Sequence, residues 1–460
     1  MMLASGDKPE APVIQSRDEL VAHIEHGAKP KVEWRIGTEH EKIPFYRDGP
    51  CPVPYEGPAG ISALLHGMGE RFGWRPVYDR DKIIALEEPS NDLGGSITLE
   101  TGGQFELSGS PLKTVFQTCE EVSRHLRQVR EIADPLGISF LALGFSPLWT
   151  LGETPRMPKS RYDIMTAYMP KVGKLGLDMM YRTATVQVNL DFAGEADMVK
   201  KLRVSLALQP IATALFANSP FTEGKPNGYL SYRSAIWLDT DNARAGMLPF
   251  AFEDGMGFER YVDYALDVPM YFVRRNKKYI DTTGASFRAF LAGNLPQLRG
   301  EKPTIADWAD HLTTIFPEVR LKRYLEMRGA DSGPWRNLCA LPALWAGLLY
   351  DQSSLDAAYG IIKSWTADER QQLRNEVPRL GLRALFRKGT VLDIARPVLD
   401  IATNGLKARG HYNLFDDETT FLRPLKEFVE GGRSAADDLL ARYHGEWGGD
   451  VRPVFTESAY

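Results

Sequence analysis

Polar and apolar residues alternate along four stretches of this chain, as they do in strands with one wet and one buried face. In the third and fourth stretches the opposite face is almost wholly apolar. The wet-face residues are Glu33, Arg35, Glu39 and Glu41; Glu100, Gln104 and Glu106; Thr185, Gln187, Asn189 and Asp191; and Arg320, Lys322, Tyr324, Glu326 and Arg328. The pattern predicts a sheet with one face on the core and the other lining a charged cavity.

Apolar residues at three- and four-residue spacing predict helices around these strands. We expect a short helix after Ser16, helices over 61–72 and 197–217, the latter kinked at Pro210, and a long helix opened by Ser110-Pro111. Strands are expected over 33–45, 83–88, 96–107, 140–144, 183–192 and 317–328, with mostly helices from Trp335 onward. Because helices do not regularly follow the strands, the expected fold class is α+β with antiparallel strands.

Composition is that of a globular protein. The chain has 460 residues, of which 43% are hydrophobic and 25% charged, so it can bury a sizeable core. A net charge of -5 gives no general attraction to nucleic acid. No apolar run approaches the roughly 20 residues that span a bilayer, so we expect no membrane partner. Three cysteines cannot build a disulfide framework. With no secretory signal or convincing transit peptide visible, a cytoplasmic location is expected.

The chain divides into three regions by pattern. Residues 1–17 are expected to be a flexible leader, residues 18–334 an α+β sheet core that carries the catalytic site, and residues 335–460 a mainly helical region. We expect the helical region to pack on the core, so that the two make one integrated unit.

Two pairs of glutamates are candidates for metal binding. Glu39 and Glu41 share one strand face, and hard carboxylate oxygens suit magnesium; a solvated strand face is the alternative. Glu100 and Glu106 flank Gly102-Gly103, and glycines inside a strand predict a bulge or a ligand close to the backbone. A bulge would shift the alternation, so a shared face for these two acids depends on its absence. His40 faces the other way and is interpreted as structural.

Amides and arginines form the second candidate group. Gln187 and Asn189 fit substrate positioning, or an ordinary half-exposed strand. Arg328 follows Glu326, and the planar guanidinium suits bidentate contact with phosphate or carboxylate; a surface ion-pair ladder is the alternative. Arg161 and Arg233 lie in loop-like contexts and carry a weak signal by themselves. Carboxylates for metal together with arginines for anions indicate phosphoryl transfer. The sequence contains no phosphate-loop motif and no dinucleotide fingerprint, so a nucleotide would be held in another way.

At these residues the sequence resembles the glutamate–cysteine ligases of the plant and proteobacterial type, from about residue 30 to residue 460. The most specific stretches include Arg35-Ile-Gly-Thr-Glu-His-Glu-Lys, Thr185-Val-Gln-Val-Asn-Leu-Asp-Phe and Phe316-Pro-Glu-Val-Arg-Leu-Lys-Arg-Tyr-Leu-Glu-Met-Arg. The resemblance implies a fold related to glutamine synthetase, with an antiparallel sheet forming a funnel-like active site. It also implies that ATP and two or more Mg²⁺ ions support joining of the L-glutamate γ-carboxylate to the L-cysteine amine through a γ-glutamyl phosphate, the first step of glutathione synthesis.

The resemblance also implies roles for single residues. The metal ligands would be Glu39, Glu41, Glu100, Glu106 and Glu326; the transferring phosphate would be held by Arg328 and Arg323; and the substrates would contact Arg161, Arg233 and Tyr271. Gln187 and Asn189, which the strand pattern marks for substrate positioning, join the substrate-binding set. Within the last group, Arg233 would bind a carboxylate of glutamate and Tyr271 would belong to the cysteine pocket.

Cys119 and Cys339 match positions that pair as a redox-sensitive disulfide in plant members of this family. Two buried thiols acting as small hydrophobes are the other interpretation. A further regulatory cysteine pair of some plant members is replaced by Thr282 and Gln297, which removes one switch. The expected assembly is a monomer or a redox-dependent homodimer. A related ligase with another acceptor amine, and a ligand-binding sensor that lost catalysis, stay open as alternatives.

Overall fold

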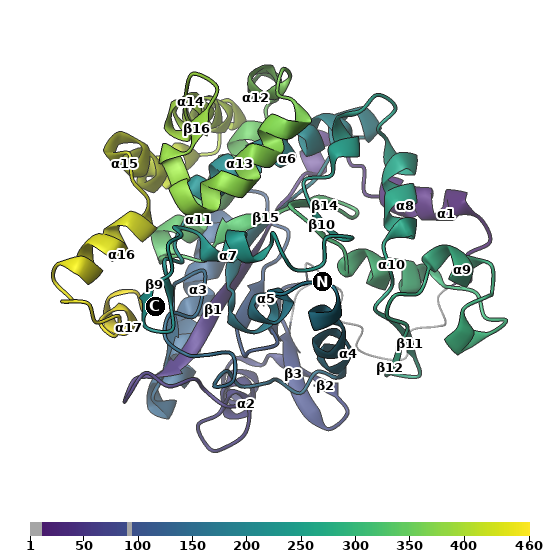
Figure 1. The fold of residues 1–460 in the computed structure, drawn as a ribbon, viewed down its shortest axis with the longest axis horizontal. Helices are drawn as coiled ribbons and strands as arrows, with labels where there is room; N and C mark the ends of the chain where they lie inside the picture. Colours follow the sequence, from purple (N-terminus) through teal and green to yellow (C-terminus); the bar gives the residue numbers. More distant parts are fainter. Residues whose placement is uncertain (1–11, 90–93) are drawn as a thin grey trace.

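The computed structural model describes residues 12–89 and 94–460, and it is built around a curved, antiparallel, nine-stranded sheet (Figure 1). The strand order is β14–β15–β7–β1–β5–β4–β3–β2, and β6 pairs with the far end of β1. The strands are β1 (Ile36–Tyr46), β2 (Arg75–Asp79), β3 (Lys82–Glu87), β4 (Ser96–Leu99), β5 (Phe105–Ser108), β6 (Ile138–Leu141), β7 (Thr185–Leu190), β14 (Val319–Leu321) and β15 (Leu325–Asp331). The long β1 therefore lies at the centre of the sheet.

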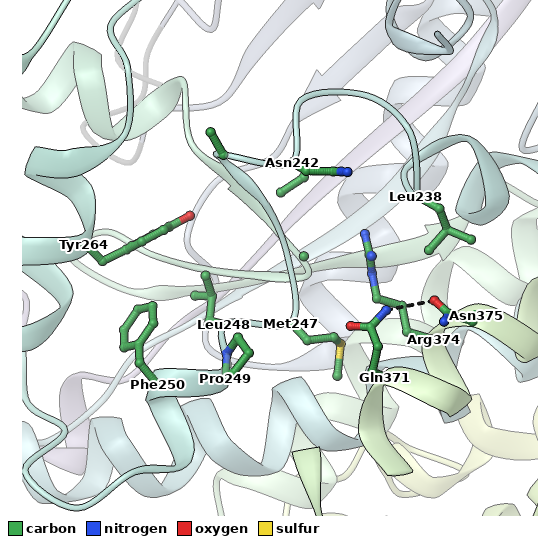
Figure 2. A pocket seen from close by; sticks show the side chains of 13 residues that line it. Leu238, Asn242, Met247, Leu248, Pro249, Phe250, Tyr264, Gln371, Arg374 and Asn375 are labelled. Atoms are coloured by element: carbon green, nitrogen blue, oxygen red, sulfur yellow. Dashed lines mark hydrogen bonds between the residues drawn. The ribbon is translucent and has the colours of Figure 1, made fainter. Parts of the chain in front are cut away.

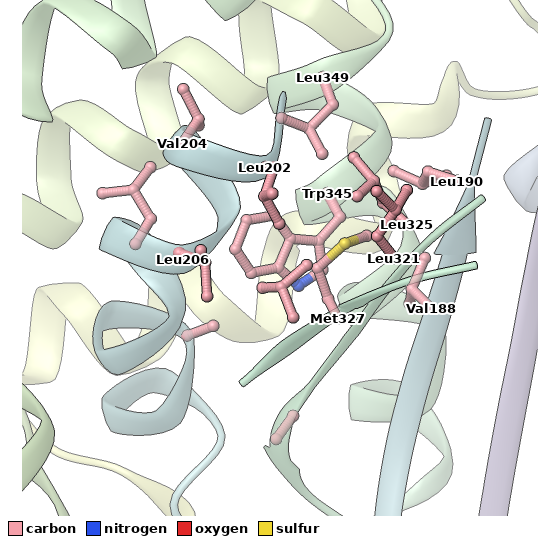
Figure 3. Packing of buried hydrophobic residues seen from close by; sticks show 14 of the residues in the cluster. Val188, Leu190, Leu202, Val204, Leu206, Leu321, Leu325, Met327, Trp345 and Leu349 are labelled. Atoms are coloured by element: carbon pink, nitrogen blue, oxygen red, sulfur yellow. The ribbon is translucent and has the colours of Figure 1, made fainter. Parts of the chain in front are cut away.

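Three long helices cover the apolar face of the sheet: α3 (Val115–Ala133), α6 (Glu195–Leu215) and α11 (Trp335–Leu349). Figure 3 shows Trp345 of α11 between Leu202 and Leu206 of α6 and the strand residues Leu325 and Met327. These side chains are almost fully buried, and burying each one contributes about 1.5–3 kcal/mol. The apolar alternation of β7 and β15 is thus used to pack the back of the sheet.

Shorter elements complete the polar side and the periphery. Helices α4 (Ser160–Tyr168), α5 (Gly176–Arg182) and α7 (Tyr232–Ile236) supply residues to the polar side, and α2 (Ile61–Phe72) packs on β2 and β3. The remaining elements of this half are α1 (Arg17–Glu25), α8 (Phe258–Asp267), α9 (Phe287–Leu291), α10 (Ile305–Thr313) and the two-stranded pairs β8 (Phe221–Thr222) with β9 (Lys225–Pro226), β10 (Ala245–Gly246) with β13 (Phe316–Pro317), and β11 (Phe272–Arg275) with β12 (Lys278–Asp281). In Figure 1, α1 lies beside α8 although far from it in sequence.

The region after Trp335 is mainly helical, as expected. Its further elements are α12 (Gln352–Ile362), α13 (Ala367–Leu380), α14 (Val391–Arg409), α15 (Arg423–Gly431), α16 (Ala435–His444), α17 (Val454–Glu457) and a small hairpin of β16 (Leu385–Phe386) and β17 (Gly389–Thr390). Residues of α12, α13 and α14 lie in the same hydrophobic cluster as those of β7, β15 and α6. We therefore propose that 18–334 and 335–460 form one integrated unit. Most of the leader expected at 1–17 lies outside the described residues.

Two predicted strands are hairpins instead. The segment 96–107 turns at Gly102-Gly103, where Gly103 has φ 90°, and so gives β4 and β5 rather than one bulged strand. The segment 317–328 turns between Leu321 and Leu325, so Arg320 lies opposite Glu326 on the neighbouring strand. Alternation alone did not reveal either turn, because polar residues continue on both sides of it.

Some element ends also differ from the prediction. Residues Lys31–Glu33 form a 3-10 turn, so β1 begins at Ile36, and neither Glu33 nor Arg35 lies on the strand. Helix α3 begins after Thr114, whose side chain forms a capping box with Gln117, rather than at Ser110-Pro111. The helix predicted over 61–72 is confirmed, as is α6 with Pro210 inside it. No helix among the described residues is both long and apolar enough to cross a bilayer.

Candidate active site

Two adjoining cavities of about 130 Å³ and 100 Å³ open on the polar face of the sheet. They share Glu41, Glu100, Tyr162, Met165, Gln187, Phe316 and Arg328. The first is lined further by Glu39, Glu106, Arg161, Phe272, Thr313, Thr314, Arg320 and Lys322, and the second by Gln104, Met180, Thr185, Arg233 and Trp237, among others. The charged cavity predicted from the alternation is thus present.

Strand register brings together the acidic residues of β1, of β5 and of the turn that follows β4. Glu41 lies directly opposite Glu106 across the β1–β5 pair, and Glu106 also accepts a hydrogen bond from the Thr98 hydroxyl. Glu100 follows the last residue of β4 and accepts from the Tyr162 hydroxyl at 3.1 Å. Because a hairpin, not a bulge, separates Glu100 from Glu106, both acids reach the same cavity.

These buried carboxylates are poorly neutralised by the protein. Burial first, and then the charges of Glu100 and Glu106, raise the pKa of Glu41 well above its ordinary value. Burial and neighbouring acids also raise the pKa of Glu39 and of Glu106. Their hydrogen-bond donors are neutral: Thr185 N–H donates to Glu41 at 2.9 Å and Asn189 Nδ2 to Glu39 at 3.0 Å. This side of the cavity therefore favours a bound cation.

A cationic cluster forms the other side, around Glu326. This carboxylate is 0% exposed and accepts from Arg320 Nε at 2.6 Å, Lys322 Nζ at 3.0 Å and Arg328 Nη1 at 2.8 Å. Burial raises the pKa of the Glu326 carboxyl, but the three cations outweigh it and hold that pKa well below its ordinary value. Both carboxylate oxygens are occupied by cationic donors. Three positive charges against one negative charge leave this side attractive to anions.

The remaining arginines line the cavities from surrounding elements. Arg328 also donates to Gln187 Oε1 at 2.7 Å, and its carbonyl accepts from Arg233 Nη2 at 3.0 Å. The guanidinium of Arg161 lies 5.1 Å from the centre of the Tyr162 ring. Arg233 is buried at the start of α7, which is capped by the Ser231 side chain. The loop-like contexts of Arg161 and Arg233 are therefore the first turns of two short helices.

The structure does not bring every predicted residue to the cavities. Arg323 is exposed at the β14–β15 turn and donates to the His26 carbonyl at 3.0 Å, because the turn directs it away from Glu326. Tyr271 lines neither cavity; its buried ring lies 3.6 Å from the Arg244 guanidinium. Asn189 lines neither cavity, but its side chain donates to Glu39 and so orients that carboxylate. His40 faces the back of the sheet, where Nε2 is 3.0 Å from the Tyr460 hydroxyl, as its structural interpretation predicted.

Several cavity residues were missing from the predicted set. Arg320 and Lys322 belong to the same alternating stretch as Arg328, which was the signal that could have identified them. Lys159, two residues before Arg161, lines neither cavity: its ammonium group donates to the Leu99 carbonyl at 2.6 Å, and burial lowers its pKa to about 8. Phe316 and Trp237 had no comparable signal, because aromatic residues are most often core.

The fit of a magnesium ion can be tested on these donors. Among residues 12–89 and 94–460, no group of three or more acidic, histidine or cysteine side chains is arranged to hold a metal. Magnesium is commonly bound by one or two carboxylates together with substrate phosphates and water. The opposed pair Glu41 and Glu106, and the nearby Glu39 and Glu100, fit that requirement. Glu326 does not, since cations already occupy both of its oxygens.

Cys119 and Cys339 form a disulfide, with Cα atoms 5.5 Å apart. It joins α3 to α11, two helices on the back of the sheet. Of the two interpretations of these cysteines, the structure contains the disulfide. Cys51 is exposed and unpaired in the described chain.

Comparison with known proteins gives consistent results. Residues 35–457 match the model of Glutamate-cysteine ligase family 2. The chain is 58% identical to the chloroplastic glutamate–cysteine ligases of Solanum lycopersicum and of Arabidopsis thaliana, over 97% of this chain and 83% of each relative. The crystal structure of a Francisella tularensis glutamate–cysteine ligase in complex with AMP aligns with a TM-score of 0.53 and 14% identity, over 92% of this chain and 88% of that one. That likeness shows the fold alone, and it confirms the expected α+β, glutamine-synthetase-like class.

The relatives correct one expectation. Those from Solanum lycopersicum, Nicotiana tabacum and Arabidopsis thaliana are named chloroplastic. The cytoplasmic location expected from the N-terminal sequence is therefore wrong, because local features of a short N-terminal stretch are a poor guide to compartment. The resemblance itself is confirmed along nearly the whole length. The chain belongs to Glutamate-cysteine ligase family 2.

Proposed function

We propose that this protein is an ATP-dependent ligase that joins the γ-carboxylate of L-glutamate to the amine of L-cysteine through a γ-glutamyl phosphate. One observation carries the proposal: a single cavity has buried, repelling carboxylates on one side and an excess of guanidinium and ammonium groups on the other. Phosphoryl transfer requires acidic residues and basic residues in one cavity, because the negative charge of a nucleoside triphosphate must be neutralised both by a metal, which the acids bind, and by fixed cations. Family membership supports the same reaction.

The cations of β14 and β15 would hold the transferring phosphate. Arg328 is the best placed, since its guanidinium lines both cavities and Gln187 and Glu326 fix its orientation. Arg320 and Lys322 would add charge beside it and take the place of the exposed Arg323. Glu326 would then act as the organiser of these three cations rather than as a metal ligand. Donors fixed in advance stabilise developing charge without reorganising during the reaction.

The carboxylates of β1, of β5 and of the turn after β4 would bind magnesium together with phosphate oxygens. Glu39, Glu41, Glu100 and Glu106 fit this role by donor chemistry and by position along one side of the cavity. The metal ions would neutralise charge on the phosphates and orient them for transfer. The number of ions, two or more, is part of the proposal.

The second cavity would hold the amino-acid substrates. Arg233 is buried there and suits a substrate carboxylate, and Gln187 offers an amide beside it. Arg161, which lines the first cavity but not the second, would contact the acceptor or the nucleotide. Tyr271 contributes only indirectly, through its packing against Phe316. These residues do not distinguish cysteine from another acceptor amine, which keeps a related ligase as the second candidate.

We also propose that the Cys119–Cys339 disulfide regulates activity or assembly. It ties α3 to α11, and both helices pack against β1, which carries Glu39 and Glu41. Reduction would free the two helices to shift relative to each other behind the metal-binding strand. Assembly as a monomer or as a redox-dependent homodimer belongs to this proposal.

The test is ADP release from the purified protein with Mg²⁺, ATP and L-glutamate, adding L-cysteine, other amino acids or ammonia in parallel reactions. Mass spectrometry identifies the product. Strong stimulation by cysteine with formation of γ-glutamylcysteine is the expected result. Turnover with a different amine would support the second candidate, and ATP binding without turnover on any acceptor would support a sensor that has lost catalysis.

A further inference from the structure

A separate cavity of about 410 Å³ lies outside the acidic site, between helix α13 and the loop that precedes α8 (Figure 2). Its apolar wall consists of Leu238, Met247, Leu248, Pro249, Phe250 and Tyr264. Its polar wall is one side of α13, with Gln371, Arg374 and Asn375. Figure 2 shows Arg374 extending from α13 into this cavity, while Gln371 and Asn375 bond to each other at its edge. We call it the outer cavity.

Arg374 lies between the outer cavity and a small void that borders the substrate cavity. A small void of about 10 Å³ lies on its other side, lined by Arg374, Trp237 and Glu318 together with Arg233 and Arg328. Arg233, Trp237 and Arg328 also line the proposed substrate cavity. The wall between the outer cavity and the substrate cavity therefore contains Arg374 on the outer side and Arg233, Trp237 and Arg328 behind it.

The guanidinium of Arg374 is held by two partners from different segments. Nε donates to Glu318 Oε1 at 2.8 Å, and Nη2 donates to the Trp237 carbonyl at 2.9 Å. The side chains of the ion pair are 10% and 11% exposed, so water screens it little. A planar fork that makes two bonds in different directions is specific to arginine. A lysine ammonium donates from a single nitrogen, so it could replace both contacts only if that one atom reached both acceptors.

Each partner of Arg374 leads directly to a proposed substrate-binding residue. The Glu318 carbonyl accepts from the Arg328 backbone N–H at 3.2 Å, which fixes the strand that carries the Arg328 guanidinium. Trp237 is the C-cap of α7, and its N–H donates to the Arg233 carbonyl at 3.4 Å. Arg233 and Arg328 are themselves joined by a hydrogen bond. Arg374 thus closes a ring of contacts around both residues.

We propose that Arg374 is a positioning residue for the substrate cavity, and that its bonds to Trp237 and Glu318 also seal that cavity against water from the outer cavity. This inference rests on the proposed function. In that reaction the amine nitrogen attacks the acyl carbon of the γ-glutamyl phosphate, and the bond from that carbon to the phosphate oxygen breaks. Water that entered through an opened wall would attack the same carbon, return L-glutamate and phosphate, and consume ATP without forming dipeptide. Excluding water from reactive intermediates is a recognised role of a closed site.

The test compares Arg374→Ala and Arg374→Lys with the wild type and with Arg379→Ala. Arg379 is an exposed arginine on the same helix, so its removal changes the charge equally without touching the wall. Two quantities are measured: KM for L-glutamate against kcat, and ADP released per dipeptide formed. Far-ultraviolet circular dichroism and melting curves verify folding. If Arg374→Ala does not fold, Arg374→Lys and Glu318→Gln provide the same readouts with smaller changes.

We expect Arg374→Ala to raise KM for L-glutamate about tenfold or more, because a small displacement of a substrate-positioning group lowers catalytic efficiency by at least this factor. We expect ADP per dipeptide to rise to about two or more, since the site no longer excludes water. Arg379→Ala should keep wild-type values of both. If Arg374→Ala folds and keeps the wild-type KM and the wild-type ratio of ADP released to dipeptide formed, this inference is overturned while the proposed function stands. A wild-type enzyme that forms no dipeptide would overturn the proposed function instead.

Discussion

Replacing Glu41 with glutamine is expected to stabilise the metal-free protein while removing its activity. Glu41 and Glu106 oppose each other on neighbouring strands, where Cβ atoms are about 5 Å apart. Two carboxylates about 6 Å apart at an effective dielectric constant near 20 repel by about 3 kcal/mol. Glutamine keeps an oxygen for the Thr185 N–H but loses the attraction to Arg233. The net gain in unfolding free energy should therefore be about 1–2 kcal/mol.

The gain should depend on pH in a defined direction. Because the pKa of Glu41 is raised in the folded state, the folded wild type binds more protons than the unfolded chain at pH values between the two pKa values. The contribution of Glu41 to the stability of the wild type therefore falls as the pH rises. The fall begins at the pKa of a glutamate in the unfolded chain, about 4.3, and ends at the raised pKa of Glu41 in the folded protein. The advantage of Glu41→Gln should be largest above that window and should disappear as pH falls to the unfolded pKa of about 4.3.

Chemical denaturation without Mg²⁺ or nucleotide measures this difference, at several pH values, beside the control Glu33→Gln. Glu33 is an exposed acid outside the strand, and its replacement should change neither stability nor turnover. Turnover of Glu41→Gln should fall by about 10²–10³-fold, the scale for losing one charge-positioning group. A variant less stable than the wild type at neutral pH, or one with wild-type turnover, would refute the reasoning on repulsion or on the site.

Three further changes test other parts of the site. Arg328→Ala should lower kcat by about 10²–10³-fold with the fold retained, and steady-state kinetics with wild-type-like kcat would contradict its proposed role. Glu326→Gln should destabilise the protein by about 3–5 kcal/mol, because it leaves buried cations without their carboxylate; denaturation curves matching the wild type would argue against that cluster. If the disulfide is regulatory, dithiol reductant should change wild-type activity, and Cys339→Ser should abolish the response. A wild type that is indifferent to reductant would end that proposal.

Alternation predicted the sheet and its two faces because burial on one side leaves a period of two in the sequence. It placed Glu39, Glu41 and Gln187 on the wet side, and all three line the cavity. Alternation cannot report which strands are neighbours, so the opposition of Glu41 and Glu106 became visible only with the β1–β5 register. Each predicted row of polar residues comes from one short stretch of sequence, whereas the cavity is assembled from several stretches that are far apart in sequence.

Turns that the sequence pattern did not reveal caused most of the errors in the predicted strands. A strand that reverses keeps its polar alternation, so the β14–β15 hairpin was predicted as one strand. Arg323 was suggested by the family resemblance and not by the alternation, and the turn directs it to the His26 carbonyl. The family resemblance suggested Tyr271, but its environment is set by packing against Arg244 that no local pattern encodes. Arg374 had no signal either, because its role depends on a contact with Glu318 across 56 residues.

The order of strands in the central sheet has a consequence for how the chain is made. β1 is translated early, yet its neighbour β7 ends at Leu190, and β15, which pairs with β7, ends at Asp331. Helix α11, which covers the back of β7, follows later still. At about 5–20 residues per second, the ribosome exposes an unfinished apolar sheet face for roughly 10–30 s before α11 can cover it. Vectorial synthesis thus makes the nascent chain a natural client for chaperones, and slower translation at low temperature lengthens that exposure.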